Sequence, residues 1–93
     1  MAKSIMQKER ECFICGTAYD LHVHHCIYGS ANRKLSDQYG LTIHLCRMHH
    51  TGSSGIHFNK ALDDQVKKLA QERFEEVYGA NKSFVEIFGR NFK

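Results

Sequence analysis

The sequence predicts an α+β fold in which two strands precede a long helix and a short C-terminal helix. Apolar side chains alternate with others over residues 21–28 and again over residues 41–45, whereas over residues 60–78 they recur at steps of three and four. Alternation places successive side chains on opposite faces of a strand, and the longer steps place them on one face of a helix. A chain of 93 residues has the usual length of one domain, so we expect a single domain over residues 1–93.

The segments before and after each strand are polar. Residues 1–11 carry charges throughout and predict a lead-in with at most a short helix. The stretch from Gly29 to Gly40 is rich in Ser, Asn, Asp, Lys and Arg, which favours a loop and therefore an open hairpin between the two strands. Residues 51–55 consist of threonine, glycine and serine and predict a second, flexible loop.

The long helix has ends that the sequence marks. Asn59 stands just before the helical period and is an N-cap candidate, while Gly79 ends the run. A last short helix is expected over residues 82–88, within a C-terminal helical extension of residues 80–93.

Four potential metal ligands lie in two pairs of equal spacing, Cys12-x-x-Cys15 and Cys46-x-x-His49. Two ligands separated by two residues sit on one tight turn, and two such turns close a tetrahedral site. The spacing therefore predicts a structural Zn²⁺ that ties the start of the chain to its middle. The alternatives are ordinary buried thiols or a disulfide. Cys26, outside both pairs, is expected to be a small core residue.

Composition limits the compartment and the partners. Residues 1–11 contain no apolar run of signal-peptide length, so we expect a cytoplasmic protein with reduced thiols, which argues against a disulfide. The chain contains no transmembrane stretch, and no membrane partner is expected. The net charge of +3 permits nucleic acid as a partner without requiring it.

Histidine is frequent, with seven in the chain. It is the commonest metal ligand and the usual general base near neutral pH. Besides His49, four histidines gather close to the predicted zinc ligands: His24, His25, His50 and His57. This surplus predicts a second, hydrolytic metal site. The remaining two, His22 and His44, are expected on the surface.

We call each of the two ligand-bearing turns, Cys12–Cys15 and Cys46–His49, a knuckle. Along the chain the features then follow one another as knuckle, strand, loop, strand, knuckle and helix. With a His-His pair on the first strand and Cys-x-x-His-His before the helix, residues 21–60 resemble the small HNH endonucleases encoded by phages and prophages. The resemblance covers about residues 12–78 and implies a zinc-stabilised ββα-metal core there. It also implies hydrolysis of double-stranded DNA to 5′-phosphate and 3′-hydroxyl ends, in the cytoplasm of a bacterium or of a phage-infected host.

The resemblance implies roles for individual residues. His24, His50 and His57 would ligate a catalytic divalent cation (Mg²⁺, Mn²⁺, Ni²⁺ or Zn²⁺), and His25 would be the general base that deprotonates the attacking water. Asn59 is open between an amide ligand and an N-cap, and the N-cap is favoured. Neighbouring strand residues point to opposite faces, so His24 and His25 can serve one phosphate only if the strand twists or ends there.

One feature of the family is missing. The asparagine expected shortly before the second knuckle, where it would orient the base, is absent from residues 40–44. Asn32, His44 or a backbone carbonyl could take that role, and the sequence favours none of them.

Three basic residues flank the proposed site, Arg33, Lys34 and Arg47. They either contact DNA phosphates or are solvated loop cations. A second function also remains open, that of a noncatalytic zinc-knuckle module that binds nucleic acid or protein. Such a module needs only four ligands, so the surplus histidines favour the enzyme.

Overall fold

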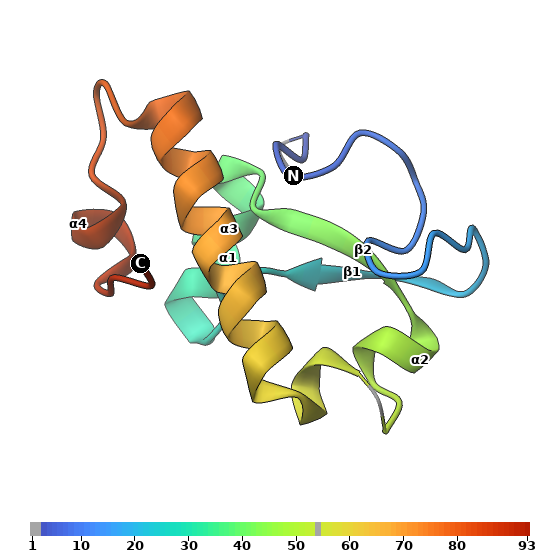
Figure 1. The fold of residues 1–93 in the computed structure, drawn as a ribbon. Coiled ribbons are helices and arrows are strands. Elements are labelled where there is room, and N and C mark those ends of the chain that lie inside the picture. Colours follow the sequence, from blue (N-terminus) through green and yellow to red (C-terminus); the bar gives the residue numbers. More distant parts are fainter. Residues whose placement is uncertain (1–2, 54) are drawn as a thin grey trace.

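Two antiparallel strands form the centre of the structure, a computed structural model that describes residues 3–53 and 55–93. Strand β1 (Leu21–His25) pairs with β2 (Thr42–Cys46), in a register that sets Leu21 opposite Cys46 and His25 opposite Thr42. In the described residues the chain forms five further helical segments, and the longest, α3, crosses beside one end of the sheet (Figure 1). The predicted mixture of helices with a two-stranded sheet is confirmed.

Strand β2 follows the predicted alternation, whereas β1 is shorter than expected and buries His24 in place of the exposed Val23. In and next to β2, Leu41, Ile43 and Leu45 are all fully buried, as an apolar face requires. The predicted first strand over residues 21–28 ends at His25, because the chain bends after it to send Cys26 into the core. The prediction that Cys26 is a small core residue is confirmed.

The predicted loop from Gly29 to Gly40 is wrong, since helix α1 (Ser30–Tyr39) fills it. The two glycines mark the ends of this helix: Gly40 has a left-handed backbone, with φ of 73°, and its N–H closes the last turn on the carbonyl of Ser36. The helix is polar and offers little apolar periodicity. Its anchor is the buried Ser36, whose hydroxyl donates to the carbonyl of Ile27 at 2.6 Å. The strands therefore pair as predicted, but across a helix and not across an open loop.

The N-terminal segment forms no helix over residues 3–11, contrary to the alternative that the sequence left open. It lies along the outer edge of β2 instead (Figure 1). The Ser4 hydroxyl donates to the carbonyl of Thr42 at 2.6 Å, and the side-chain oxygen of Gln7 accepts from the N–H of His44 at 2.8 Å. Because strand pairing would use these same backbone groups, the segment closes this edge of the sheet.

The second knuckle forms a short helix, α2 (Arg47–His50), which follows β2 directly. A single 3₁₀ turn, η1 (Ile56–Phe58), precedes α3. Of the predicted flexible loop over residues 51–55, Ser54 lies outside the described residues, and residues 51–53 form a turn.

The long helix α3 (Lys60–Tyr78) has the predicted bounds. The side chain of Asn59 accepts from the N–H of Leu62 at 3.0 Å, which confirms the N-cap. The final helix α4 (Phe84–Phe88) begins two residues later than predicted, after the N-cap Ser83. It packs an aromatic cluster against α3 and α1, with buried Phe74, Phe84 and Phe88 at its centre. Among the described residues, no helix is both long and apolar enough to cross a membrane.

Candidate metal centres and the adjoining pocket

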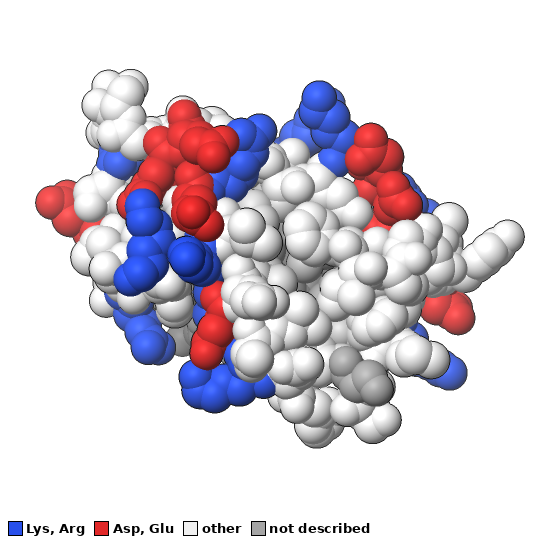
Figure 2. All heavy atoms as spheres, viewed as in Figure 1, with Lys and Arg blue, Asp and Glu red and all other residues white. Residues whose placement is uncertain are grey.

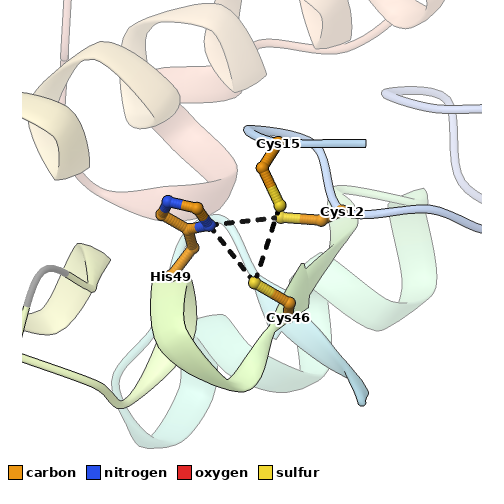
Figure 3. A group of neighbouring side chains, drawn as sticks. All are labelled: Cys12, Cys15, Cys46 and His49. Carbon is orange, nitrogen blue, oxygen red and sulfur yellow. Dashed lines mark hydrogen bonds between the residues drawn. The ribbon is translucent and has the colours of Figure 1, made fainter. Parts of the chain in front are cut away.

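The two predicted knuckles meet at one end of the sheet (Figure 3). The Sγ atoms of Cys15 and Cys46 are 3.8 Å apart, and Nδ1 of His49 lies 3.7 Å from Sγ of Cys12 and 3.2 Å from Sγ of Cys46. A tetrahedral zinc with Zn–S bonds of about 2.3 Å and Zn–N bonds of about 2.0–2.1 Å would separate two sulfurs by about 3.8 Å and a sulfur and a nitrogen by about 3.6 Å. The four side chains thus lie at distances that one ion could bridge, and the predicted gathering of these four potential ligands is confirmed.

Local backbone structure explains why the first knuckle can aim both of its sulfurs inward. The N–H of Gly16 bonds the carbonyl of Cys12 at 2.9 Å, and Gly16 has a φ of 79°, a left-handed conformation that glycine adopts without strain. The N–H of Phe13 donates to the carbonyl of His44 at 2.8 Å and so joins the knuckle to β2. All four cysteines are free thiols, so the alternative of a disulfide is wrong.

The thiols of the first knuckle have perturbed pKa values. Burial raises the pKa of Cys12, but hydrogen bonds from the backbone amides of Cys46, Cys15 and Ile14 outweigh it and bring the pKa to about 6. This thiol is therefore ionised at neutral pH, which is the form that binds metal. For Cys15, the backbone amide of Thr17 lowers the pKa, yet burial and the adjacent sulfurs raise it above its ordinary value. Sulfurs this close resist joint ionisation, and a cation at their centre would remove that resistance.

A second group of ligands is formed by His24 on β1, His50 on α2 and His57 in η1. One ring nitrogen from each lies within 4.8 Å of the others, and the Nε2 atoms of His50 and His57 are 3.2 Å apart. Two imidazoles bound to one ion at about 2.0–2.1 Å would hold their nitrogens about 3.3 Å apart. We call these three residues the histidine cluster, which brings together the three predicted histidine ligands.

The electrostatics of the histidine cluster suit a cation. His24 is 2 % exposed, and its Nε2 has no hydrogen-bond partner among the described residues. Such an unpaired buried group costs about 1–3 kcal/mol, and a bound metal would remove this cost. Burial, followed by the nearby His50 and His57, lowers the pKa of His24 to about 4, and burial also lowers the pKa of His50. Both rings are therefore neutral at pH 7, as ligation requires.

His22 is drawn into this region, although the sequence assigned it to the surface. It is half-buried, and its Nδ1 lies 2.9 Å from Nδ1 of His50. This contact occupies one nitrogen of His50 and leaves Nε2 to face His57. His44 is also half-buried, on the other strand, and belongs to neither group of ligands. His49 and His50 are adjacent on α2, so this short helix supplies one ligand to each group.

A pocket of about 450 Å³ opens beside the histidine cluster. Its lining includes both His24 and His25. Strand β1 ends at His25, which meets the condition that the sequence set for these neighbours to serve one phosphate. Nε2 of His25 lies 2.8 Å from Oδ1 of Asp37 on α1.

Sequence reasoning did not identify Asp37, because it assigned residues 29–40 to a loop. Of the side-chain candidates that it offered, the Asn32 amide is directed to the carbonyl of Phe88 at 3.4 Å, and His44 lies opposite Val23 and not opposite His25 in the sheet. One signal in the sequence could have found Asp37 if the helix had been recognised. Asp37 follows Arg33 by four residues, so the two share a helix face, and Arg33 was already a candidate for the site.

The remaining predicted site residues divide between the pocket and the surface. Arg33 lines the pocket, whereas the exposed Lys34 and Arg47 do not belong to its lining. The side-chain oxygen of Asn59 caps α3, the role that the sequence favoured for it. Over α3, basic and acidic side chains lie side by side, whereas the surface over the strands and α2 is largely uncharged in this view (Figure 2). Among the described residues, Arg33 is the basic residue in the lining that also contains His24, His50 and His57.

A tyrosine forms a further wall of the pocket, which the sequence did not predict. The Tyr28 hydroxyl donates to Oδ2 of Asp63 at 2.7 Å, and its ring lies 6.0 Å from that of His24. Lys67 completes this network at 2.9 Å from Asp63, and its side chain is only 15 % exposed. Burial, followed by Asp63, raises the pKa of Tyr28, so the hydroxyl keeps its proton.

Comparisons with protein families, with curated proteins and with solved structures find no match for this chain. The fold and the site therefore define the class: a small domain of helices and a two-stranded sheet that carries a Cys/His group able to hold a metal.

Proposed function

We propose that the protein is a metal-dependent DNA endonuclease of the HNH type, built on a ββα-metal core. The observation that carries this proposal is the histidine cluster, with its unpaired buried Nε2 on His24, at the wall of a pocket that His25 also lines. We assign a structural metal to the three cysteines and His49. The histidine cluster would then be available for a catalytic ion, and the adjoining pocket would admit a phosphate.

The chemistry of the donors favours a particular kind of cation. Three imidazole ligands suit Zn²⁺ or Ni²⁺ better than Mg²⁺, which prefers oxygen ligands and retains its waters. When bound, such an ion would stabilise the negative charge that develops on the phosphoryl and departing oxygens. We therefore expect activity with Ni²⁺, Zn²⁺ or Mn²⁺ before activity with Mg²⁺.

The side chains of the pocket have separate roles in the proposed reaction. His25 accepts a proton from the attacking water, and Arg33 binds a phosphate oxygen of the DNA backbone. Tyr28, held by Asp63, closes one side of the pocket beside His24. The products would be a 5′-phosphate and a 3′-hydroxyl end.

A nicking assay on supercoiled plasmid tests the proposal, with Mg²⁺, Mn²⁺, Ni²⁺ or Zn²⁺ added to zinc-loaded protein. His25→Ala should lower the single-turnover rate by about two to four orders of magnitude, the usual worth of a positioned base. His44→Ala is the matched control, because this histidine is half-buried on β2 and lies outside the pocket lining. Absence of cleavage with all four metals, or equal rates for wild type and His25→Ala, would refute the proposal.

A noncatalytic zinc-knuckle module is the second candidate, and one observation favours it. Phe13 and Ile14, between the first two cysteines, are 36 % and 39 % exposed and present an apolar surface to a partner. The same assay separates the two functions. A module would bind DNA or protein through the knuckle and leave the plasmid intact.

A further inference from the structure

His25 makes one well-defined contact outside the pocket. Its Nε2 lies 2.8 Å from Oδ1 of Asp37, and the side chains of the two residues are 14 % and 39 % exposed. This is a short, charge-assisted hydrogen bond. An ionised carboxylate can only accept, so the hydrogen of this bond belongs to His25 Nε2.

The element that carries Asp37 is fixed against the strand. Ser36, the preceding residue, is fully buried and bonds the backbone of Ile27 through both its hydroxyl hydrogen and its oxygen, at 2.6 and 3.3 Å. Leu35 and Tyr39 pack against the core on the same helix. Asp37 is thus presented to His25 by a rigid turn of helix.

The position of the pocket determines which nitrogen of His25 is available. His25 lines the pocket, whereas Asp37 is not part of that lining. With Nε2 directed to Asp37, Nδ1 has no hydrogen-bond partner among the described residues and is the nitrogen left for a water molecule in the pocket. The bond to Asp37 keeps the proton on Nε2, so Nδ1 has a free lone pair in the neutral ring.

We propose that Asp37 is the positioning residue of the catalytic base: it orients the His25 ring and holds it in the tautomer whose Nδ1 can accept a proton from water. This inference rests on the proposed nuclease function. In the reaction, Nδ1 takes one proton from water as the water oxygen bonds phosphorus, and the bond from phosphorus to the 3′ oxygen breaks. The 3′ oxygen takes a proton from solvent, and His25 later releases its own to solvent. Asp37 stays ionised and stabilises the imidazolium in between, in the manner of the carboxylate in a Ser-His-Asp triad.

Two variants and one control test this role on the full-length, zinc-loaded protein. Asp37→Ala removes the acceptor, and Asp37→Asn retains the shape but loses the charge. Asp64→Asn is the matched control, because Asp64 pairs with Lys60 on α3 at 2.8 Å and its loss changes the net charge equally. Single-turnover nicking at saturating DNA and metal measures the rate, fluorescence titrations measure the Kd for DNA and for Ni²⁺, and ¹⁵N NMR of the histidine rings reports the tautomer of His25.

For a positioning residue, both Asp37 variants should lose about 10- to 100-fold in rate, with the two Kd values within about twofold of wild type. The NMR spectrum should show the Nε2–H tautomer of His25 in wild type and a mixture in Asp37→Ala. If Asp37 merely tethers α1 to β1, the charge is irrelevant and Asp37→Asn will cleave like wild type. That result, or an unchanged tautomer in Asp37→Ala, would overturn the inference about Asp37. If the wild type still cleaved the plasmid, the proposed nuclease function would stand. Absence of wild-type cleavage would refute both.

Discussion

Without a second metal, the variant His24→Leu should be more stable than the wild type. With that metal added, the wild type should be the more stable of the two. Without that metal, the unpaired Nε2 of His24 costs the folded protein about 1–3 kcal/mol. Leucine removes the unpaired group but fits the site less well, at a cost of up to about 1.5 kcal/mol. We expect a net stabilisation of about 1 kcal/mol, or about 4–8 °C in Tm for a domain of this size.

The added metal should act only on the wild type. Ni²⁺ at a concentration of 100 times its Kd should raise the wild-type free energy of unfolding by about 2.7 kcal/mol, which exceeds the advantage of the variant. His24→Leu lacks one of three ligands and should gain little. Thermal unfolding with and without Ni²⁺ measures the reversal, and metal analysis verifies that one zinc per chain remains bound throughout. His44→Leu, a histidine outside both ligand groups, is the control and should respond to Ni²⁺ as wild type does. Equal stabilisation of wild type and His24→Leu by Ni²⁺ would place the metal elsewhere and refute the reasoning.

Three further predictions follow from the two metal groups and the pocket. Cys12→Ser should release the zinc and unfold the domain, since such sites contribute on the order of 10 kcal/mol to folding. Chelator titration followed by circular dichroism measures this loss, and a cooperative, unchanged melt of the variant would contradict the prediction. Arg33→Gln should weaken DNA binding and reduce the salt slope by about one unit, whereas the same change at Lys34, outside the pocket lining, should have less effect; equal loss at both positions would contradict it. Without the second metal, the free energy of unfolding should fall as pH drops from 6.5 towards 4, because in that range the unfolded state protonates His24 and the folded state does not. In His24→Leu the dependence of this free energy on pH should be weaker, and urea titrations at several pH values measure it.

The parts of the fold that the sequence predicted correctly depend on local patterns. Each knuckle is set by two ligands on one turn, and the period of α3 continues for 19 residues. The N-cap at Asn59 needs only the N–H of Leu62, three residues ahead. In such cases neighbours along the chain determine the structure.

Helix α1 was missed because its stability comes from tertiary contacts. Its most buried side chain is a serine, held by the backbone of Ile27, and the spacing of Leu35 and Tyr39 is too short a pattern to reveal a helix. The contact between His25 and Asp37 depends on this packing. For the same reason, the proximity of His57 to His50 was an expectation from resemblance until the fold placed η1 against α2.

Helix α2 predicts an order in which the two metals would bind. It has four residues, too few to persist alone in water, and its adjacent His49 and His50 face different groups of ligands. Zinc capture by the cysteines and His49 would order the helix and thereby place His50 beside His57. We therefore expect a newly made chain to lack the proposed nuclease activity until zinc is bound, whatever the supply of the second metal. A cell short of zinc would then hold the protein in a dormant form.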